Sequence, residues 1–278
     1  MIKLSAENYQ RVRPLFNGLE FNLAIDSVLA GNTPGQVFAD DPIEPKLALL
    51  WDRQDALFLA VLPDMELDIN QLQRVEEVIR RTIIPDARQR FIPHLSLQWY
   101  PGEWESLLPD NLIDWQPKKA YRRLYMYKQI GVDYRHGLLP GFAVERINQR
   151  TLQSDLLNRD QVIGWIESFW ASPAIFLERG FGYCLTTNNA ITSWCLSVFN
   201  FGNRFELGVA TAEQYRQLGL ASLAVASCLE YCLLNDLIPE WHCWESNIPS
   251  IRLAEKVGFE QRLSYPAFQL QTGLTYSG

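Results

Sequence analysis

One stretch of the chain constrains its fold more than any other, because a strand pattern leads through a turn into a long helix pattern. Residues 204–211 alternate apolar with polar or small side chains, which predicts a half-buried strand. Residues 216–234 are rich in Ala and Leu and predict a helix, with Gly219 and Ala221 near its start. Small residues at such a junction let backbone N–H groups approach an anion closely. These residues form an R-x-x-G-x-A pattern from Arg216 to Ala221. Taken alone, this pattern more often marks a glycine needed for close packing than an anion site.

Further strand and helix patterns lie on both sides of this stretch. A helix is expected over residues 160–170, and a hairpin over 181–200 turns at Asn188-Asn189. A short strand at 241–244 and a helix at 249–257, stopped by Gly258, complete the order β-β-β-α-β-α-β. Neither G-x-G-x-x-G nor a Walker-type motif occurs, so a dinucleotide-binding or P-loop fold is excluded.

The first half of the chain also mixes α and β patterns. Apolar residues at helical spacing over 6–30 end at a Gly- and Pro-rich turn, and a second helix is expected over 68–82. Strands are expected in five short segments, at residues 36–39, 46–50, 56–62, 95–99 and 121–127. Glycines and a proline crowd residues 135–141, which predicts a boundary there. The predicted fold is α/β (α+β) with two domains, residues 1–137 and 138–278.

The composition is that of a globular chain with a full core, since 47% of the residues are apolar and 21% are charged. The formal net charge of −7 argues against a nucleic-acid partner, which requires a basic surface. The apolar runs are shorter than the roughly 18 residues of a membrane helix, and the N-terminus has no signal-peptide pattern. Five cysteines, all after residue 183, predict a cytoplasmic protein with reduced, buried thiols. The oligomeric state stays open.

Three further patterns could indicate a functional site, but each is better explained by structural residues. Cys228 and Cys232 stand one helical turn apart and His242-Cys243 follow, but without a C-x-x-C pair they predict core thiols rather than zinc ligands, and no metal is expected. His94-x-Ser96 matches half of a twin H-x-[ST] phosphoesterase motif whose second half is missing. Aromatic residues at helical spacing are expected in the core rather than in the wall of a substrate site: Trp165, Phe169 and Trp170.

A second motif makes the first one specific. Residues 247–259 read N-x-x-S-x-x-L-A-x-K-x-G-F. Together with the strand at 204–211 and the R-x-x-G-x-A turn, this motif resembles the GCN5-related N-acetyltransferases (GNAT) over residues 175–265. The resemblance implies a GNAT fold with a mixed, mostly antiparallel sheet for residues 138–278. A weaker resemblance over nearly the whole chain, carried by residues 27–35, Asp40-Asp41, 180–184 and 206–211, points to a two-part subfamily that includes proteins similar to zwittermicin A resistance acetyltransferases.

The resemblance implies that acetyl-CoA is the cosubstrate and places it residue by residue. The backbone of Val209, Ala210 and Thr211 would pair with the pantetheine arm in a slot between two splayed strands. Backbone amides would hold the pyrophosphate, namely those of Arg216, Gln217, Leu218, Gly219, Leu220 and Ala221. Asn247 would contact the cofactor, although an N-cap alone explains it as well. Gly208 fits either a β-bulge or close approach of a ligand.

The implied chemistry is direct acetyl transfer to an amine, which must lose a proton to attack the thioester. Glu206 is the candidate general base, because strand alternation places it on the face of Gly208 and Ala210, which leaves room for a ligand. The alternative is a solvent-exposed strand carboxylate. Ala254 stands where many relatives carry a Tyr as general acid, so a proton donor would come from Ser193, Tyr183 or Cys195, or be dispensable.

The resemblance implies an N-acetyltransferase for a small or antibiotic-like amine. A non-catalytic acyl-CoA-binding module and a protein N-acetyltransferase remain alternatives. The N-terminal domain can be interpreted as a diverged GNAT-like half. It has no R-x-x-G-x-[GA] counterpart, so it is expected to shape the acceptor pocket rather than to bind CoA.

Overall fold

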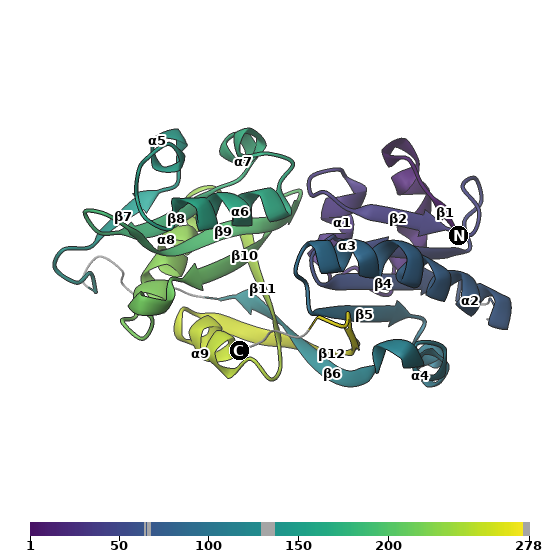
Figure 1. Ribbon diagram of the computed structural model, residues 1–278. Coiled ribbons are helices and arrows are strands. Elements are labelled where there is room, and N and C mark those ends of the chain that lie inside the picture. Colours follow the sequence, from purple (N-terminus) through teal and green to yellow (C-terminus); the bar gives the residue numbers. More distant parts are fainter. Residues whose placement is uncertain (64, 66–67, 129–136, 275–278) are drawn as a thin grey trace. The chain divides into compact units, whose positions relative to one another are not determined.

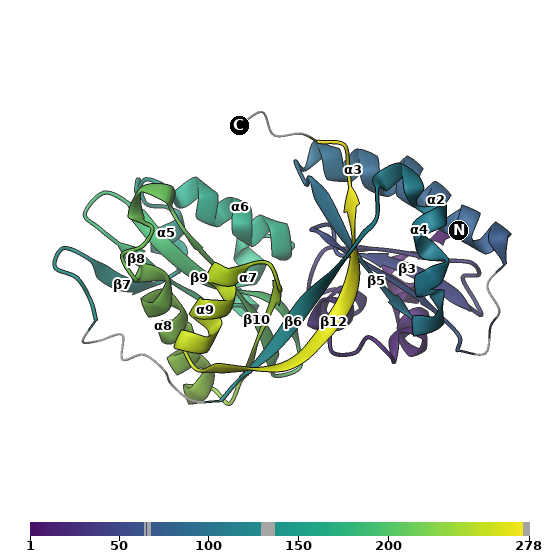
Figure 2. The same cartoon turned by 90° about the horizontal axis from the view of Figure 1, so that it is seen from below.

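A computed structural model describes residues 1–63, 65, 68–128 and 137–274 (Figure 1). The chain divides into two compact units: unit 1 comprises Met1–Tyr121 and Tyr265–Gly278, and unit 2 comprises Arg122–Ser264. Strands β6 (Lys118–Tyr127) and β12 (Phe259–Gln271) are long and carry residues of both units (Figure 2). No helix in the described ranges is both long and apolar enough to cross a membrane.

Unit 1 is a sheet whose strands lie in the order β1 (Ile2–Lys3), β2 (Gln36–Ala39), β3 (Leu47–Trp51), β4 (Ala56–Val61), β5 (His94–Tyr100) and β12. Neighbours pair antiparallel except β4 and β5, which run parallel and stay in register over five consecutive positions, from Ala56↔Ser96 to Ala60↔Tyr100. This parallel pair is therefore closed along nearly its whole length.

The α-helices of unit 1 are α1 (Leu23–Leu29), α2 (Ile69–Val78), α3 (Ile84–Gln89) and α4 (Leu108–Asn111). Its 3-10 helices are η1 (Ala6–Phe16), η3 (Gly102–Ser106) and η4 (Ile113–Trp115), and η2 (Ile79–Ile83) is a π-helix. The helix expected over 68–82 begins at a capping box, because Asp68 and Gln71 exchange side-chain and backbone hydrogen bonds. The apolar pattern of 6–30 folds as η1 and α1 rather than as one helix, since Pro14 and Gly18 lie within it.

Unit 2 is a sheet in the order β6, β11 (Ile238–Trp244), β10 (Arg204–Thr211), β9 (Ile191–Phe201), β8 (Gly182–Thr186) and β7 (Ala143–Arg146). Its helical segments are α5 (Gln149–Leu152), α6 (Arg159–Phe169), α7 (Pro173–Arg179), η5 (Glu213–Tyr215), α8 (Leu220–Leu234) and α9 (Ile248–Lys256). The hairpin, the strand at 204–211 and the order of elements agree with the sequence prediction. The fold is mixed α/β, and its sheets are mostly antiparallel, as expected.

The alternation of β10 decides which helix covers which face. Phe205 and Leu207 point into the core that includes Leu223 and Val225 of α8. Side chains of α6 cover the opposite face, and Figure 1 shows α6 and α8 on the two sides of these strands. Helix α8 is buried almost all round, which explains why its Ala- and Leu-rich sequence shows no polar face.

Two predicted boundaries differ from the structure. Helix α8 begins at Leu220 rather than at Arg216, because the backbone is left-handed at Gln217 (φ 66°) and Gly219 (φ 79°). The units divide at Tyr121/Arg122, within β6, and the last residues return to unit 1. The Gly- and Pro-rich stretch that suggested a break at residue 137 lies within unit 2, and residues 135 and 136 fall outside the described residues. Strands that pass between units carry no turn residues to signal the division.

Gly208 has a packing reason to be glycine. A Cβ at this position would lie 2.7 Å from Val198 Cγ1 and 3.1 Å from Cζ3 of Trp165, a residue of α6. Both contacts are shorter than ordinary van der Waals separation, so the Trp165 ring occupies the space over Gly208. The expectation that this face offers room for a ligand is therefore wrong at Gly208.

This packing predicts opposite effects for two glycine substitutions in unit 2. Gly208→Ala should lower the free energy of unfolding by about 1–3 kcal/mol, because the added methyl overpacks against Val198 and Trp165. Gly164→Ala is the matched control, since its Cβ would meet open space within helix α6, and it should stabilise by about 0.5–1 kcal/mol. Urea unfolding followed by circular dichroism measures both. Wild-type stability of Gly208→Ala would contradict the packing argument.

Candidate functional site

Strands β10 and β11 separate part-way along their length. They pair in parallel at three positions, Arg204↔Ile238, Phe205↔Pro239 and Glu206↔Glu240. Both strands then continue, to Thr211 and Trp244, and these described residues form no further pairs between β10 and β11. Beyond Glu206, one backbone edge of β10 therefore has no neighbouring strand. Such an edge presents N–H and C=O groups that an extended ligand can pair with.

A cavity of about 420 Å³ lies where this edge meets the start of α8 and α9. It brings together several residues predicted from sequence: Val209, Ala210, Thr211, Arg216, Ala221 and Asn247. Gln217, Leu218, Gly219 and Leu220 connect Arg216 to Ala221 without lining the cavity. Its remaining walls are Pro249, Ser250 and Leu253, which the sequence analysis did not assign although they lie within the 247–259 motif.

The loop before α8 has the backbone of an anion site. Its left-handed residues, Gln217 and Gly219, belong to the conformations in which successive N–H groups converge on one side. The first N–H groups of a helix have no partner within it. In α8 one of them is already engaged, because Ser222 N–H donates to Gly219 O at 3.1 Å. Arg216 is exposed at the cavity and adds a positive charge. Helix dipole, loop amides and guanidinium thus favour an anion at the same end of α8.

Asn247 has a structural role that the sequence predicted. It is the N-cap of α9, and its Oδ1 accepts a hydrogen bond from Ser250 N–H at 3.2 Å. Ser250 Oγ in turn accepts from Trp241 Nε1–H at 3.0 Å, which ties the start of α9 to β11. The cap interpretation is therefore confirmed, and the same side chain also lines the cavity.

An ion pair stands where the two strands separate. Arg204 donates two hydrogen bonds to Glu240, one of them from Nη2 to Oε2 at 3.0 Å, and Glu240 has no exposed surface. Glu206 lies opposite Glu240 in register and is half-buried. A register shift occurs here, but the extra residue is on β9, because Phe205 pairs with Asn200 and Leu207 with Ser197. The alternation of β10 is kept, so Glu206 stays on the face of Gly208.

None of the alternative proton donors lines the cavity, although Ser193 contacts two residues that do. Ser193 Oγ donates to Ala210 O at 3.0 Å and lies 2.9 Å from Thr211 Oγ1, so it braces β10. Cys195 is buried beneath α8, and the Tyr183 ring packs near Tyr231 of that helix. Ala254 is fully buried, whereas its neighbour Leu253 lines the cavity.

The five cysteines are buried and unpaired, as expected. Burial raises the pKa of the Cys184 thiol to about 12 and holds the pKa values of Cys228 and Cys232 well above the usual range. These thiols are therefore protonated at neutral pH, which suits core packing and not a nucleophile. Burial, with Arg122 and Arg204 nearby, lowers the pKa of His242 to about 3, so its imidazole is neutral. The described residues contain no cluster of three metal-ligating side chains.

Comparisons with known proteins agree on one family. Residues 13–268 match the sequence model of the GNAT acetyltransferase family. The uncharacterized N-acetyltransferase YdfB of Bacillus subtilis strain 168 is 25% identical over 277 residues, which cover 96% of this chain and 97% of that protein.

Solved structures show the same fold. A GCN5-related N-acetyltransferase-like protein from Streptococcus suis 89/1591 has a TM-score of 0.69 at 22% identity and covers 96% of this chain and 99% of its own. A tandem GNAT protein from the clavulanic acid biosynthesis pathway has a TM-score of 0.58 at 12% identity and covers 99% and 98%. Because the family match spans most of the sequence, the chain belongs to the GNAT acetyltransferase family, a family of N-acetyltransferases.

Proposed function

We propose that this protein transfers an acetyl group from acetyl-CoA directly to the amine of a small molecule. The observation that carries the proposal is the separation of β10 and β11 beyond Glu206↔Glu240, directly beside an anion site at the start of α8. An extended chain with a terminal pyrophosphate matches both features. The chain can pair with the open backbone edge of β10, and the pyrophosphate supplies the negative charge for the anion site. The five buried, unpaired thiols fit a reducing compartment such as the cytoplasm.

Two parts of acetyl-CoA, the pantetheine arm and the pyrophosphate, have partners in this arrangement. The backbone of Val209–Thr211 pairs with the amides of the pantetheine arm, as a neighbouring strand would. The amides of residues 216–221 and the Arg216 guanidinium hold the pyrophosphate. Asn247 keeps its capping bond through Oδ1 and has its Nδ2 donor group left for the cofactor.

Glu206 is the proposed general base. An amine with a pKa of about 10.4 is mostly protonated at pH 7, and reaching its neutral form costs about 4.6 kcal/mol. Glu206 takes the first proton from the ammonium group, and the neutral nitrogen then forms the N–C bond as the C–S bond of the thioester breaks. The second proton lost from nitrogen passes to solvent or to the departing CoA thiolate. Arg204 neutralises the adjacent Glu240 through two hydrogen bonds, so the buried carboxylate beside Glu206 carries its own counter-ion.

Unit 1 does not bind acetyl-CoA in this proposal. Its strands β4 and β5 correspond in order to β10 and β11, with helical segments between them, but they remain paired over five positions instead of three. Without the opening, the β4/β5 pair offers no backbone edge to a pantetheine arm. We therefore expect one acetyl-CoA for each chain, and assign recognition of the acceptor to unit 1.

A second candidate, an acyl-CoA-binding module without turnover, is favoured by Ala254, which has no proton to donate at the place where many relatives carry Tyr. Release of CoA in a screen of amines, aminoglycosides and peptides separates the two. Turnover with any amine excludes the binding module, whereas binding without turnover across the screen would favour it.

The proposed pyrophosphate site predicts a charge-specific effect at Gly219. A Cβ here would meet no atom within 4 Å, and the positive φ strains Glu and Gln alike. Gly219→Glu should therefore weaken acetyl-CoA binding at least tenfold more than Gly219→Gln, a difference of about 1.4 kcal/mol, because only Glu repels the pyrophosphate. Calorimetric titration of both variants measures this, with thermal unfolding as a check on folding. Equal affinities in the two variants would refute this placement.

The proposed base predicts a loss of turnover at Glu206. Glu206→Gln keeps the size of the side chain and removes its ability to accept the proton, so the rate should fall by about 10²–10⁴-fold with little change in acetyl-CoA affinity. The loss should shrink as the pH rises toward the pKa of the amine, because more substrate is already neutral. Initial rates across pH 6–9 test this, and a variant with wild-type rates throughout would place the base elsewhere.

A further inference from the structure

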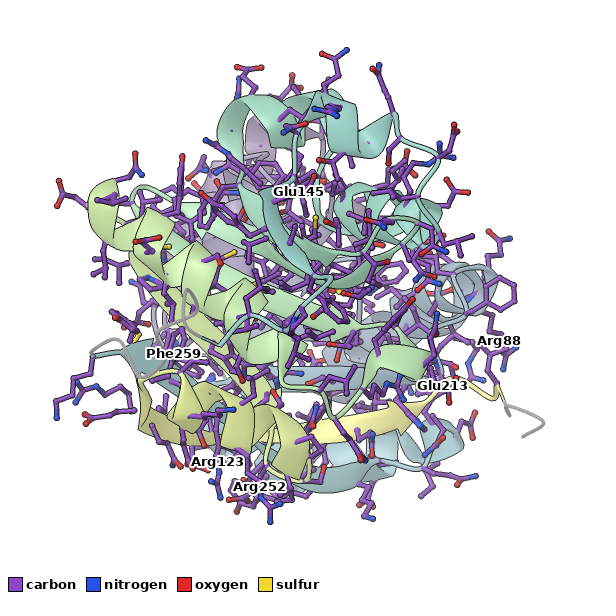
Figure 3. The ribbon with its side chains drawn as sticks, turned by 90° about the vertical axis from the view of Figure 1, so that its left-hand side faces the viewer. Arg88, Arg123, Glu145, Glu213, Arg252 and Phe259 are labelled. Carbon is purple, nitrogen blue, oxygen red and sulfur yellow. The ribbon has the colours of Figure 1, made fainter. Side chains whose placement is uncertain are left out.

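A second cavity of unit 2, of about 580 Å³, lies between α5 and the ends of β7 and β8. It shares no lining residue with the cavity at the start of α8. Figure 1 shows α5 over β7, and Figure 3 labels Glu145 of β7 on this part of the unit. The charged and hydroxyl side chains in its lining are Glu145, Arg150, Thr151, Ser154, Thr186 and Thr187.

Most of these side chains are held in place by one another. Asn148 and Thr151 form a capping box at the start of α5, and Ser154 Oγ donates to Thr151 O at 2.8 Å. On the facing strands, Thr186 Oγ1 donates to Glu145 Oε1 at 2.8 Å. The part of the wall formed by Glu145, Thr151, Ser154 and Thr186 is therefore already ordered, whereas the exposed Arg150 side chain is ordered only when a ligand binds.

Arg150 differs from the neighbouring arginines of the same unit. Arg146 places its guanidinium over the Tyr231 ring at 4.8 Å, and Arg159 pairs with Asp160. Among the described residues, Arg150 makes no ion pair and no side-chain hydrogen bond, and it lines the cavity that also holds the carboxylate of Glu145. Within the part of the chain that the structure describes, the cavity thus presents a guanidinium without an ion-pair or hydrogen-bond partner and a carboxylate with one oxygen engaged.

Opposite charges in one cavity select among ligands. A polyphosphate would be repelled by Glu145, and a polyamine would be repelled by Arg150. A carboxylate can accept two parallel hydrogen bonds from Arg150, while an ammonium group is matched by Glu145. The hydroxyls of Thr151, Ser154 and Thr187 suit the polar groups between. We propose that this cavity binds a small zwitterion with one carboxylate and one ammonium group, a free amino acid or a dipeptide.

The cavity also touches the element that precedes the proposed cofactor loop. Phe142 lines it, and its ring packs edge-on against Tyr215 with centroids 6.4 Å apart. Tyr215 ends η5 and is followed directly by Arg216. Binding of the zwitterion can thus alter affinity at the loop, and by linkage each ligand would change the affinity of the other equally. This coupling, unlike the binding itself, rests on the proposed function.

The test screens the twenty protein amino acids and their glycyl dipeptides singly against the full-length protein without acetyl-CoA, by calorimetry. The tightest binder is then compared with its N-acetyl and its amide derivatives, which lack the ammonium and the carboxylate. Both derivatives should bind at least tenfold more weakly. Arg150→Gln and Glu145→Gln should each reduce affinity for the parent at least tenfold. Arg179→Gln removes the same charge from a residue of α7 that pairs with Glu178 outside the cavity, and should bind normally.

Arg150 and Glu145 are exposed, so both variants should keep the thermal stability of the wild type. A loss of binding is then not a loss of folding. A changed acetyl-CoA affinity in the presence of the ligand identifies it as an effector of the cofactor loop, whereas an unchanged affinity shows that the cavity binds it without coupling to the loop. Either result keeps the site. Failure of every probe to bind, or equal affinity in wild type and Arg150→Gln, overturns it. Because the screen is carried out without acetyl-CoA, its result on the zwitterion site does not depend on the proposed function.

Discussion

The separation of β10 from β11 is the constraint on which the rest of the site depends. A backbone edge buried without a partner is costly, because each unpaired N–H or C=O loses its hydrogen bond to water. The edge of β10 beyond Glu206 lies within a sheet and yet has no neighbouring strand there. Its groups can be satisfied by water or by a ligand of extended shape. The Arg204–Glu240 ion pair lies at the point where the opening begins, because Glu240 belongs to the last paired position.

The two units show what this opening adds to a shared pattern. Both contain a parallel pair of strands connected through helical segments, β4 with β5 and β10 with β11. In unit 1 the pair is closed, because β4 and β5 stay hydrogen-bonded over five consecutive positions. In unit 2 the pair opens, and η5 connects β10 to a loop with two left-handed residues. One sheet geometry thus serves as scaffold in unit 1 and as candidate binding site in unit 2.

Much of unit 2 could be predicted from sequence, because its signals are local. The bounds of the strand at 204–211 followed from alternation, and the N-cap role of Asn247 followed from the Pro and Ser that come after it. The start of α8 was misplaced, because helix propensity does not reveal left-handed residues at 217 and 219. Gly208 was attributed to a bulge or a ligand, since the contact with Trp165 joins residues far apart in sequence. The cavity beneath α5 was missed for the same reason.

The account can be tested most directly by hydrogen–deuterium exchange with and without acetyl-CoA. It predicts that exchange slows at Val209–Thr211 and in the loop over residues 216–221, where the ligand would supply partners to backbone amides. The amides of β4 in unit 1 should exchange at the same rate in both conditions. Unchanged exchange in β10 and the loop, or equal protection of β4, would contradict the claim that the open strand pair is the cofactor site.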